Sequence, residues 1–357
     1  MSQAPSLMTT DLDSTALQNA LLGWYDRSGR SLPWRIRPED REKGAIADPY
    51  AIWLSEIMLQ QTTVPHATPY WYRFLELWPQ VGDLAAAPRE HVMREWAGLG
   101  YYARARNLHA CARHVAEELD GCFPDTLDGL RALPGVGEYT ANAILAAAFN
   151  RPANVVDGNV ERVITRLHRL PTPMPKAKPE VRKLAGEIAS DDRPCDYAQA
   201  IMDLGATVCS PRNPDCPSCP WQSSCAARAE GDMHLYPVKL PKRAKPVRTG
   251  TAWLVRSERG IWLRQRPDSG LLGGMMEVPS SDWREDAVPA EPPFRAEWTD
   301  RGEIRHVFTH FELRLQVKEA RAAGNWRPND GVWITEGDLK QAALPSVMRK
   351  VIAAGRI

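Results

Sequence analysis

Four cysteines crowded into one short segment constrain this chain more than any other feature of its sequence. They follow the spacing Cys-x6-Cys-x2-Cys-x5-Cys, and they are Cys209, Cys216, Cys219 and Cys225. Four thiolates so close together can surround one tetrahedral zinc ion or one iron–sulfur cubane. Zinc ribbons usually pair two Cys-x2-Cys knuckles, and this segment has only one. The spacing alone therefore predicts a metal centre and leaves zinc and iron–sulfur open.

Length, charge and hydropathy set the remaining limits. A chain of 357 residues is long for one hydrophobic core, so two domains are expected. Apolar runs are too short to span a bilayer, and the start MSQAPSLMTTDLDS lacks the layout of a signal peptide. A cytoplasmic protein is therefore expected, with a metal centre rather than disulfides. The net charge is only +1, so any nucleic-acid footprint must be local.

Helical periodicity dominates the first two-thirds of the chain, with Ser14 as a candidate N-cap of the first helix. Few stretches before residue 230 alternate as strands do, so this part is expected to be an all-helical domain. The predicted helices span 14–30, 50–64, 69–78, 89–96, 103–120, 126–133, 139–149, 158–170, 178–190 and 195–208.

A proline-rich, basic segment then separates two kinds of pattern. Residues 233–249 read as a linker, because prolines stiffen it and its charge keeps it solvated. Beyond it, 251–256 and 261–266 read as a hairpin, 311–318 as a half-buried strand, and the C-terminal tail as a helix. The predicted organisation is a helical region at 1–232 and a small α+β domain at 250–357.

The segment LPGVGEYTANAI (133–144) places a Pro-Gly-x-Gly turn between two predicted helices. Gly135 and Gly137 can adopt positive φ and expose backbone N–H groups at a helix start, which together form an anion site. A DNA phosphate would suit that site, but an ordinary corner between helices uses the same residues.

Two carboxylates are candidates for chemistry. Glu56 lies on a helix whose neighbouring positions are mostly apolar, and burial there would raise its pKa and keep it protonated as a general acid. Asp157 stands just before a predicted helix. Cleavage of a glycosidic bond commonly uses two carboxylates across a sugar. Simpler alternatives are a surface glutamate and a helix N-cap.

The cysteine spacing after a helical domain with LPGVG resembles the endonuclease III superfamily of DNA repair glycosylases. That resemblance implies a helix–hairpin–helix fold and one [4Fe-4S] cluster. Five motifs in order then resemble one branch, the MutY adenine DNA glycosylases. These motifs are LPWR, SEIMLQQTTV, GLGYYARARNL, LPGVGEYTA and VDGNVERV.

The resemblance to MutY implies a role for each matching residue. Glu56 corresponds to the acid that protonates adenine, Asp157 to the catalytic aspartate, and Asn159 to an asparagine that supports the site. Gln61 and Tyr101 correspond to side chains that wedge into the base stack. Other matches fall where the family lines its adenine pocket; they are Leu32, Trp34, Arg35 and Asp203. Arg104 and Arg106 could contact phosphates or lie on a solvated helix face.

Tyr139 occupies the position where bifunctional relatives carry a lysine that attacks C1′ and leads to strand cleavage. A phenol cannot form a Schiff base, so the resemblance implies base removal without an efficient lyase step. The hydroxyl of Tyr139 is expected to hydrogen-bond the catalytic aspartate.

The C-terminal domain resembles the MutT-like (Nudix) recognition domain of the same family. The Glu-rich helix that holds Mg²⁺ in working Nudix hydrolases is missing, so recognition of 8-oxoguanine rather than hydrolysis is expected. Phe308, Thr309 and His310 match the family's recognition loop, where many members carry serine at the position of Thr309. Cross-strand packing is the simpler interpretation of His306 and His310.

The resulting prediction is a monofunctional adenine DNA glycosylase acting on duplex DNA with adenine opposite 8-oxoguanine or guanine. A monomer is expected, nucleoid-associated when acting on DNA. The alternatives are a thymine or uracil mismatch glycosylase of the same superfamily, a lesion-binding protein without activity, and a nucleotide pyrophosphatase. Glu56 and Asp157 argue against the second alternative, and the missing metal box argues against the third.

Overall fold

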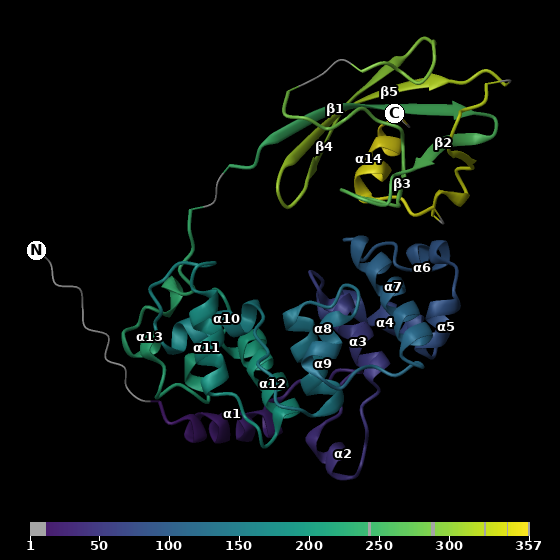
Figure 1. Cartoon of the computed structure of the whole chain (residues 1–357). Helices are drawn as coiled ribbons and strands as arrows, with labels where there is room; N and C mark the ends of the chain where they lie inside the picture. Colours follow the sequence, from purple (N-terminus) through teal and green to yellow (C-terminus); the bar gives the residue numbers. More distant parts are fainter. Residues whose placement is uncertain (1–11, 242–243, 287–289, 325, 341, 356–357) are drawn as a thin grey trace, which may run out of the picture. The chain divides into compact units, whose positions relative to one another are not determined.

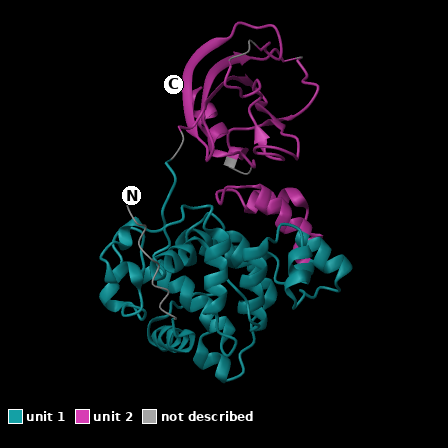
Figure 2. Ribbon diagram, turned by 60° about the vertical axis from the view of Figure 1, so that its left-hand side comes forward, with its two compact units in different colours: residues 1–82, 111–241 teal, residues 83–110, 242–357 magenta. Residues whose placement is uncertain are grey.

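The computed structural model describes residues 12–241, 244–286, 290–324, 326–340 and 342–355. The chain forms two compact units (Figure 2), of which the first comprises residues 1–82 and 111–241 and the second residues 83–110 and 242–357. The first eleven residues, and Lys242 and Arg243 of the predicted linker, lie outside the described part. None of the described helices is long and apolar enough to cross a membrane.

Helices form the chain up to residue 230, as Figure 1 shows, and within the described residues the first strand begins at Val247. They are α1 (Ser14–Ser28), α2 (Pro38–Glu42), α3 (Pro49–Leu59), α4 (Val64–Leu77), α5 (Val81–Ala86), α6 (Arg89–Glu95), α7 (Ala103–Glu118), α8 (Leu127–Ala132), α9 (Glu138–Phe149), α10 (Gly158–Leu167), α11 (Lys178–Glu187), α12 (Pro194–Asp203) and α13 (Ala226–Ala229). A π-helical turn, Leu204–Val208, continues α12. The predicted all-helical fold is confirmed.

Several predicted boundaries were wrong for local reasons. The N-cap of α1 is Asp13, not Ser14, since the Asp13 carboxylate accepts a hydrogen bond from the N–H of Ala16 at 3.0 Å. The helix expected over 50–64 ends at Leu59, where the backbone enters a turn. Three short helices were not predicted: α2 in the loop after LPWR, α5, and the four-residue α13 after the last cysteine of the segment. Four to six residues are too few for a hydrophobic period to show.

The cysteine segment packs on the helices that surround it. Trp221, between the third and fourth cysteines, is 2% exposed, and its indole N–H donates to the carbonyl of Leu17 in α1 at 2.8 Å. Its neighbours in this core are apolar side chains of α1, α10, α11 and α12, with Cys209, Cys219 and Cys225 at the margin. The cysteine segment and the N-terminal helix therefore share one hydrophobic core.

The second unit contains a mixed sheet with strand order β3-β2-β1-β5-β4 and with β6 paired to β2. The strands are β1 (Val247–Ser257), β2 (Gly260–Gln265), β3 (Met276–Glu277), β4 (Thr299–Val307), β5 (Glu312–Arg321) and β6 (Val332–Ile334). The predicted hairpin is confirmed as the antiparallel pair β1–β2, and the alternating strand is β5, which runs parallel to β1.

Helix α14 (Ser346–Ala354) packs its apolar face on this sheet. Its side chains Val347, Met348 and Val351 are fully buried among inward-facing residues such as Leu313 and Leu315 of β5. The predicted small α+β domain at the C-terminal end of the chain is thereby confirmed.

Candidate active site

Helix α3 places Glu56 against the first turn of α9. Its neighbours Ile52, Trp53 and Ile57 are buried, whereas the Glu56 carboxyl keeps partial exposure. Tyr139 stands at the start of α9, and its hydroxyl donates to Oε2 of Glu56 at 3.3 Å. The same hydroxyl lies 3.5 Å from the sulfur of Met202 on α12. The partner of the tyrosine is therefore Glu56, and the expected bond to Asp157 is not the one that forms.

Burial is the main influence on the acidity of Glu56, and it raises the pKa of this carboxyl from 4.5 to about 7. The hydrogen bond from Tyr139 and the positive charge of Arg35 act in the opposite direction, because both stabilise the carboxylate. The charge of Asp157 raises the pKa further. Glu56 is consequently close to half protonated at neutral pH, as a general acid requires.

Asp157 is the N-cap of α10, which was the simpler of its two interpretations. Its Oδ1 accepts the backbone N–H groups of Asn159 and Val160, both at 2.8 Å. Its Oδ2 accepts the side-chain amide of Asn159, also at 2.8 Å. An N-cap can also act in chemistry: these bonds fix the orientation of the Asp157 carboxylate, and its negative charge raises the pKa of Glu56.

A hydrogen-bonded chain connects Asn159 with the cysteine segment. Arg162 on α10 donates to Oδ1 of Asn159 at 2.9 Å and to the carbonyl of Cys209 at 2.8 Å. Gly205 packs against Asn159 so closely that an added Cβ would meet the Asn159 Cβ at 2.6 Å. The Asp157 end of α10 and the cysteine segment therefore cannot shift independently.

The four cysteines line one cavity of about 30 Å³, together with Arg166 and Val208 among others. Arg166 is only 2% exposed, and its Nη1 lies 3.3 Å from the sulfur of Cys209 and donates to the carbonyl of Ser210 at 2.7 Å. Among the described residues, no group of three or more His, Cys, Asp or Glu side chains is arranged to hold a single metal ion. A cubane spreads its four ligands over four iron atoms and needs no such convergence.

The residues expected around adenine are tied together by one buried carboxylate. Asp203 is fully buried and pairs with Arg35 at 2.9 Å and Arg30 at 2.7 Å. These guanidinium groups lower the pKa of Asp203 although burial alone would raise it. Trp34 packs edge-on against Trp71 at 5.7 Å between ring centroids, and Leu32 precedes it half-exposed. Arg35 also links these residues to Glu56, because its positive charge lowers the pKa of the Glu56 carboxyl.

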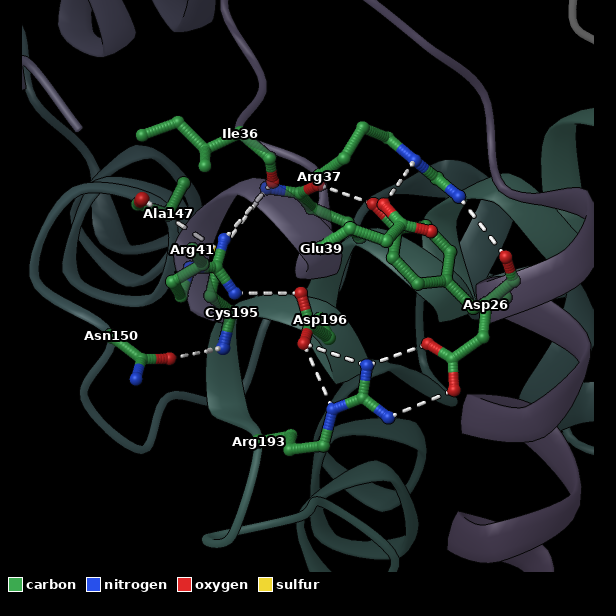
Figure 3. A network of polar contacts seen from close by, with 12 residues as sticks. Asp26, Ile36, Arg37, Glu39, Arg41, Ala147, Asn150, Arg193, Cys195 and Asp196 are labelled. Atoms are coloured by element: carbon green, nitrogen blue, oxygen red, sulfur yellow. Dashed lines mark hydrogen bonds and ion pairs between the residues drawn. The ribbon is translucent and has the colours of Figure 1, made fainter. Parts of the chain in front are cut away.

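A second polar network, shown in Figure 3, anchors the segment after Trp34 to the start of α12. Arg41 on α2 donates to Asp196 at 2.7 Å and lies 2.9 Å from the sulfur of Cys195. Arg193 donates to both Asp26 on α1 and Asp196. These ion pairs fix the loop that carries Trp34 and Arg35.

The glycine turn between α8 and α9 is a type II turn, with Pro134 and Gly135 at its centre and the Val136 N–H bonded to the Leu133 carbonyl. Gly135 has φ of +76°, as predicted. Gly137 could adopt positive φ as well, but its φ is −89°. A Cβ on Gly137 would meet no atom of the described residues within 4 Å. Internal packing therefore does not require glycine there, and the surface in front of the α9 N-terminus is open.

Gln61 occupies a strained turn at the end of α3. The Thr62 N–H bonds to the Leu59 carbonyl, and Gln61 has φ of +60° at the position where type II turns favour glycine. The preceding Gln60 donates its side-chain amide to Thr140 at 3.2 Å. The Gln61 side chain itself is exposed.

Tyr101, in the second unit, also has a left-handed backbone, with φ of +48°, and its side chain is 52% exposed. Arg104 is buried beneath the same loop, so neither a phosphate contact nor a solvated position describes it. Arg106 donates to the carbonyl of Gly273. Sequence periodicity could not predict the contacts of Arg104 and Arg106. Both side chains donate to main-chain carbonyls, which every residue carries.

Phe308, Thr309 and His310 form the turn between β4 and β5. Thr309 and His310 are exposed, whereas Phe308 stacks on Phe311 at 4.8 Å between centroids. His306 on β4 contacts the Phe308 ring at 4.6 Å between centroids, so this histidine packs on the turn that follows its own strand. The turn presents a hydroxyl and an imidazole at one tip.

Sequence reasoning did not single out Arg162 and Arg166. Both lie on α10, four residues apart and hence on one face of the helix. The available signal was two arginines at that spacing among apolar residues, just before the cysteine segment.

Comparison with known families matches both parts of the chain. Residues 54–189 match the HhH-GPD superfamily of base excision DNA repair proteins. Residues 251–354 match the NUDIX domain. A structure of a thermostable thymine-DNA glycosylase superposes with a TM-score of 0.53 and 26% identity, covering 61% of this chain and 97% of that one. A trapped endonuclease III–DNA covalent intermediate superposes with a TM-score of 0.51 and 24% identity, covering 62% and 99%, and shows the fold alone.

Curated relatives extend over nearly the full length. The human adenine DNA glycosylase is 36% identical over 401 aligned residues, covering 94% of this chain and 73% of the human protein. The mouse adenine DNA glycosylase is 35% identical, covering 95% and 78%. That of Buchnera aphidicola (subsp. Acyrthosiphon pisum) is 31% identical, covering 83% of each. With both domains matched and identities above 30% over most of its length, the chain belongs to the MutY family of adenine DNA glycosylases, enzymes of base excision repair.

Proposed function

We propose that this adenine DNA glycosylase cleaves the N-glycosidic bond with Glu56 as general acid and Asp157 as the carboxylate that stabilises or captures the oxocarbenium ion. The observation that carries the proposal is the environment of Glu56. Burial raises the pKa of Glu56 to about 7, and Tyr139 hydrogen-bonds the carboxyl group. Protonation of the adenine ring turns the base into a better leaving group.

Asp157 would act on the sugar. Its two oxygens accept hydrogen bonds from Asn159 and Val160, which fix the carboxylate in orientation before the substrate arrives. A preorganised negative charge stabilises the positive charge that develops at C1′ without reorganisation during the reaction. Asn159 is a positioning residue, since it contacts Asp157 through its side-chain amide.

Tyr139 supports base removal without strand cleavage. Its phenol is held by Glu56 and cannot form a Schiff base with C1′. Tyr139→Lys is expected to gain cleavage at the abasic product, whereas the parent protein leaves the strand intact. Rapid strand cleavage by the parent protein would contradict the monofunctional assignment.

One [4Fe-4S] cluster is proposed to be held by Cys209, Cys216, Cys219 and Cys225. The spacing of these cysteines resembles that of the endonuclease III superfamily, and the four thiols line one cavity. When bound, the cluster supplies a rigid, charged core for this segment. Arg166 and Arg162 then hold the segment against α10 and the Asp157 end of the site.

The substrate is proposed to be duplex DNA with adenine opposite 8-oxoguanine or guanine, bound by a monomer in the cytoplasm or nucleoid. Gly135 and Gly137 would bind a backbone phosphate at the N-terminus of α9, since both glycines are exposed. Gln61 and Tyr101 would wedge into the base stack, and both side chains are exposed on strained turns.

Adenine would be received by Leu32, Trp34, Arg35 and Asp203. Thr309 and His310 would contact the oxidised base from the β4–β5 turn, with Phe308 packed behind them. In this proposal the catalytic region comprises 1–232, the linker 233–249 and the recognition domain 250–357.

The deciding experiment measures single-turnover release of adenine from a duplex with adenine opposite 8-oxoguanine. The parent protein is expected to release adenine and Glu56→Gln to lose at least about 100-fold in rate, because a general acid contributes that much. Glu118→Gln, at an exposed end of α7, is the matched control. Full activity of Glu56→Gln would show that the acid is misassigned.

A further inference from the structure

The loop from Trp96 to Arg104 holds Tyr101 in a conformation that the backbone does not favour. Gly98 and Gly100 have φ of +114° and +70°, and Tyr101 follows with φ of +48°. A left-handed backbone costs a bulky residue roughly 1–2 kcal/mol. Tyr101 is also 52% exposed, so burial of its own ring does not account for the conformation. Some other group must fix the loop.

Arg104 fills the inside of this loop. Its Nη2 donates to the carbonyl oxygens of Leu99 at 3.0 Å and Gly100 at 3.2 Å. Its guanidinium lies over the ring of Trp96 at 5.2 Å and over the ring of Tyr101 at 5.6 Å. The residue is 8% exposed, so these contacts are largely shielded from water and correspondingly strong.

Trp96 is a second side chain that holds this loop. It is fully buried, and its indole N–H donates to the same Gly100 carbonyl at 3.0 Å. The N–H of Arg104 bonds to the Tyr101 carbonyl at 2.8 Å, which closes the turn into α7. The carbonyl before Tyr101 and the Tyr101 ring are thus both fixed by one rigid, planar cation.

We propose that Arg104 is a positioning residue for base extrusion, and that it works by holding Tyr101 as a preformed wedge. The proposal rests on the proposed role of Tyr101 in DNA. Only arginine combines two main-chain hydrogen bonds with a planar face for two aromatic rings. Lysine keeps the charge and loses both the fork and the stacking surface.

The test uses the full-length protein and a duplex with 2-aminopurine beside the target adenine, whose fluorescence reports unstacking. Arg104→Lys is expected to slow unstacking about 10-fold, which is one buried interaction of about 1.4 kcal/mol. The matched control is Arg113→Lys, an exposed residue on the same helix paired with Glu117, and it is expected to behave as the parent protein.

A double-mutant cycle with Tyr101→Ala separates positioning from general stability. If Arg104 acts through Tyr101, the double variant unstacks DNA no more slowly than Tyr101→Ala alone. Additive effects, or an Arg104→Lys variant with parental unstacking, would overturn the proposal. If Arg104→Lys does not fold, Trp96→Phe replaces it, because this variant removes the hydrogen bond to the Gly100 carbonyl. Trp96→Phe is expected to slow unstacking less than Arg104→Lys and to have no further effect when combined with Tyr101→Ala. Additive effects of Trp96→Phe and Tyr101→Ala would also overturn the proposal.

If Tyr101→Ala itself leaves unstacking unchanged, the wedge role in the proposed function fails. That outcome differs from a failure of the present proposal, in which Tyr101→Ala is defective and Arg104→Lys is not.

Discussion

The hydroxyl of Tyr139 donates a hydrogen bond to Glu56 at 3.3 Å and so joins the first turn of α9 to the middle of α3. The two residues are 83 positions apart in the chain. The bond acts on the charged form of the carboxyl group and limits how far burial raises its pKa. Tyr139 thus adjusts the pKa of the carboxyl group that is proposed to protonate adenine.

The rate of adenine release should depend on the protonation of Glu56. Because burial raises its pKa to about 7, the protonated fraction falls as the pH rises through that value. Single-turnover rates are expected to fall about 10-fold per pH unit on the alkaline side. A rate that stays constant from about pH 6 to 9 would show that Glu56 does not supply the proton.

The free energy of unfolding should also depend on the protonation of Glu56, and the contribution of this residue should decrease as the pH rises. The folded-state pKa of Glu56 is raised, so its favourable contribution is complete below 4.5 and is lost as the pH rises through about 7. At pH about 8, Glu56→Gln is therefore expected to be more stable than the parent by about 1–3 kcal/mol. Urea unfolding of both proteins at several pH values measures this difference. The prediction is contradicted if the stability of Glu56→Gln relative to the parent decreases as the pH rises.

Removal of the Tyr139 hydroxyl should move the alkaline limit of activity upward. Tyr139→Phe deletes a hydrogen bond that stabilises the carboxylate, so the pKa of Glu56 is expected to rise. The pH–rate profile of the variant should then shift by about half a unit to one unit toward higher pH. The effect should vanish in the Glu56→Gln background, and a shift toward lower pH would argue against the hydrogen bond.

Loss of one cysteine should remove the metal centre and loosen the core around it. Cys219→Ser is expected to lose iron and visible absorbance, and to lower the melting temperature, because the segment packs on α1 and α10 through Trp221. Cys122→Ser, at an exposed cysteine, is the control and should keep its iron. One zinc ion per chain in the parent protein would disprove the cluster.

The hydroxyl of Thr309 should contribute to discrimination and not to chemistry. Thr309→Val keeps the shape of the exposed β4–β5 turn and removes the hydroxyl that is proposed to hydrogen-bond the oxidised base. Preference for adenine opposite 8-oxoguanine over guanine is expected to fall about 5- to 10-fold. Thr309→Ser should retain it, and an equal loss on both substrates would assign Thr309 a structural role instead.

Local features of the sequence were sufficient to predict the fold class and the family. The cysteine spacing, the LPGVG turn and the period-two pattern of β5 each depend on residues within one short segment. For such segments, spacing and backbone preference determine the structure directly. Adenine DNA glycosylase activity followed from five motifs in order, and the comparisons confirm it.

Only the tertiary structure decided which groups meet. Tyr139 contacts Glu56 instead of Asp157, Asp203 binds Arg30 and Arg35 across more than 160 positions, and Arg104 turns inward instead of toward solvent. None of these choices follows from spacing, because a buried charge takes whichever partner the packing of distant helices brings within 3 Å. The sequence by itself determined the fold class and the side chains proposed for catalysis; the packing of α3, α9 and α12 determined which groups those side chains contact and therefore their acidity.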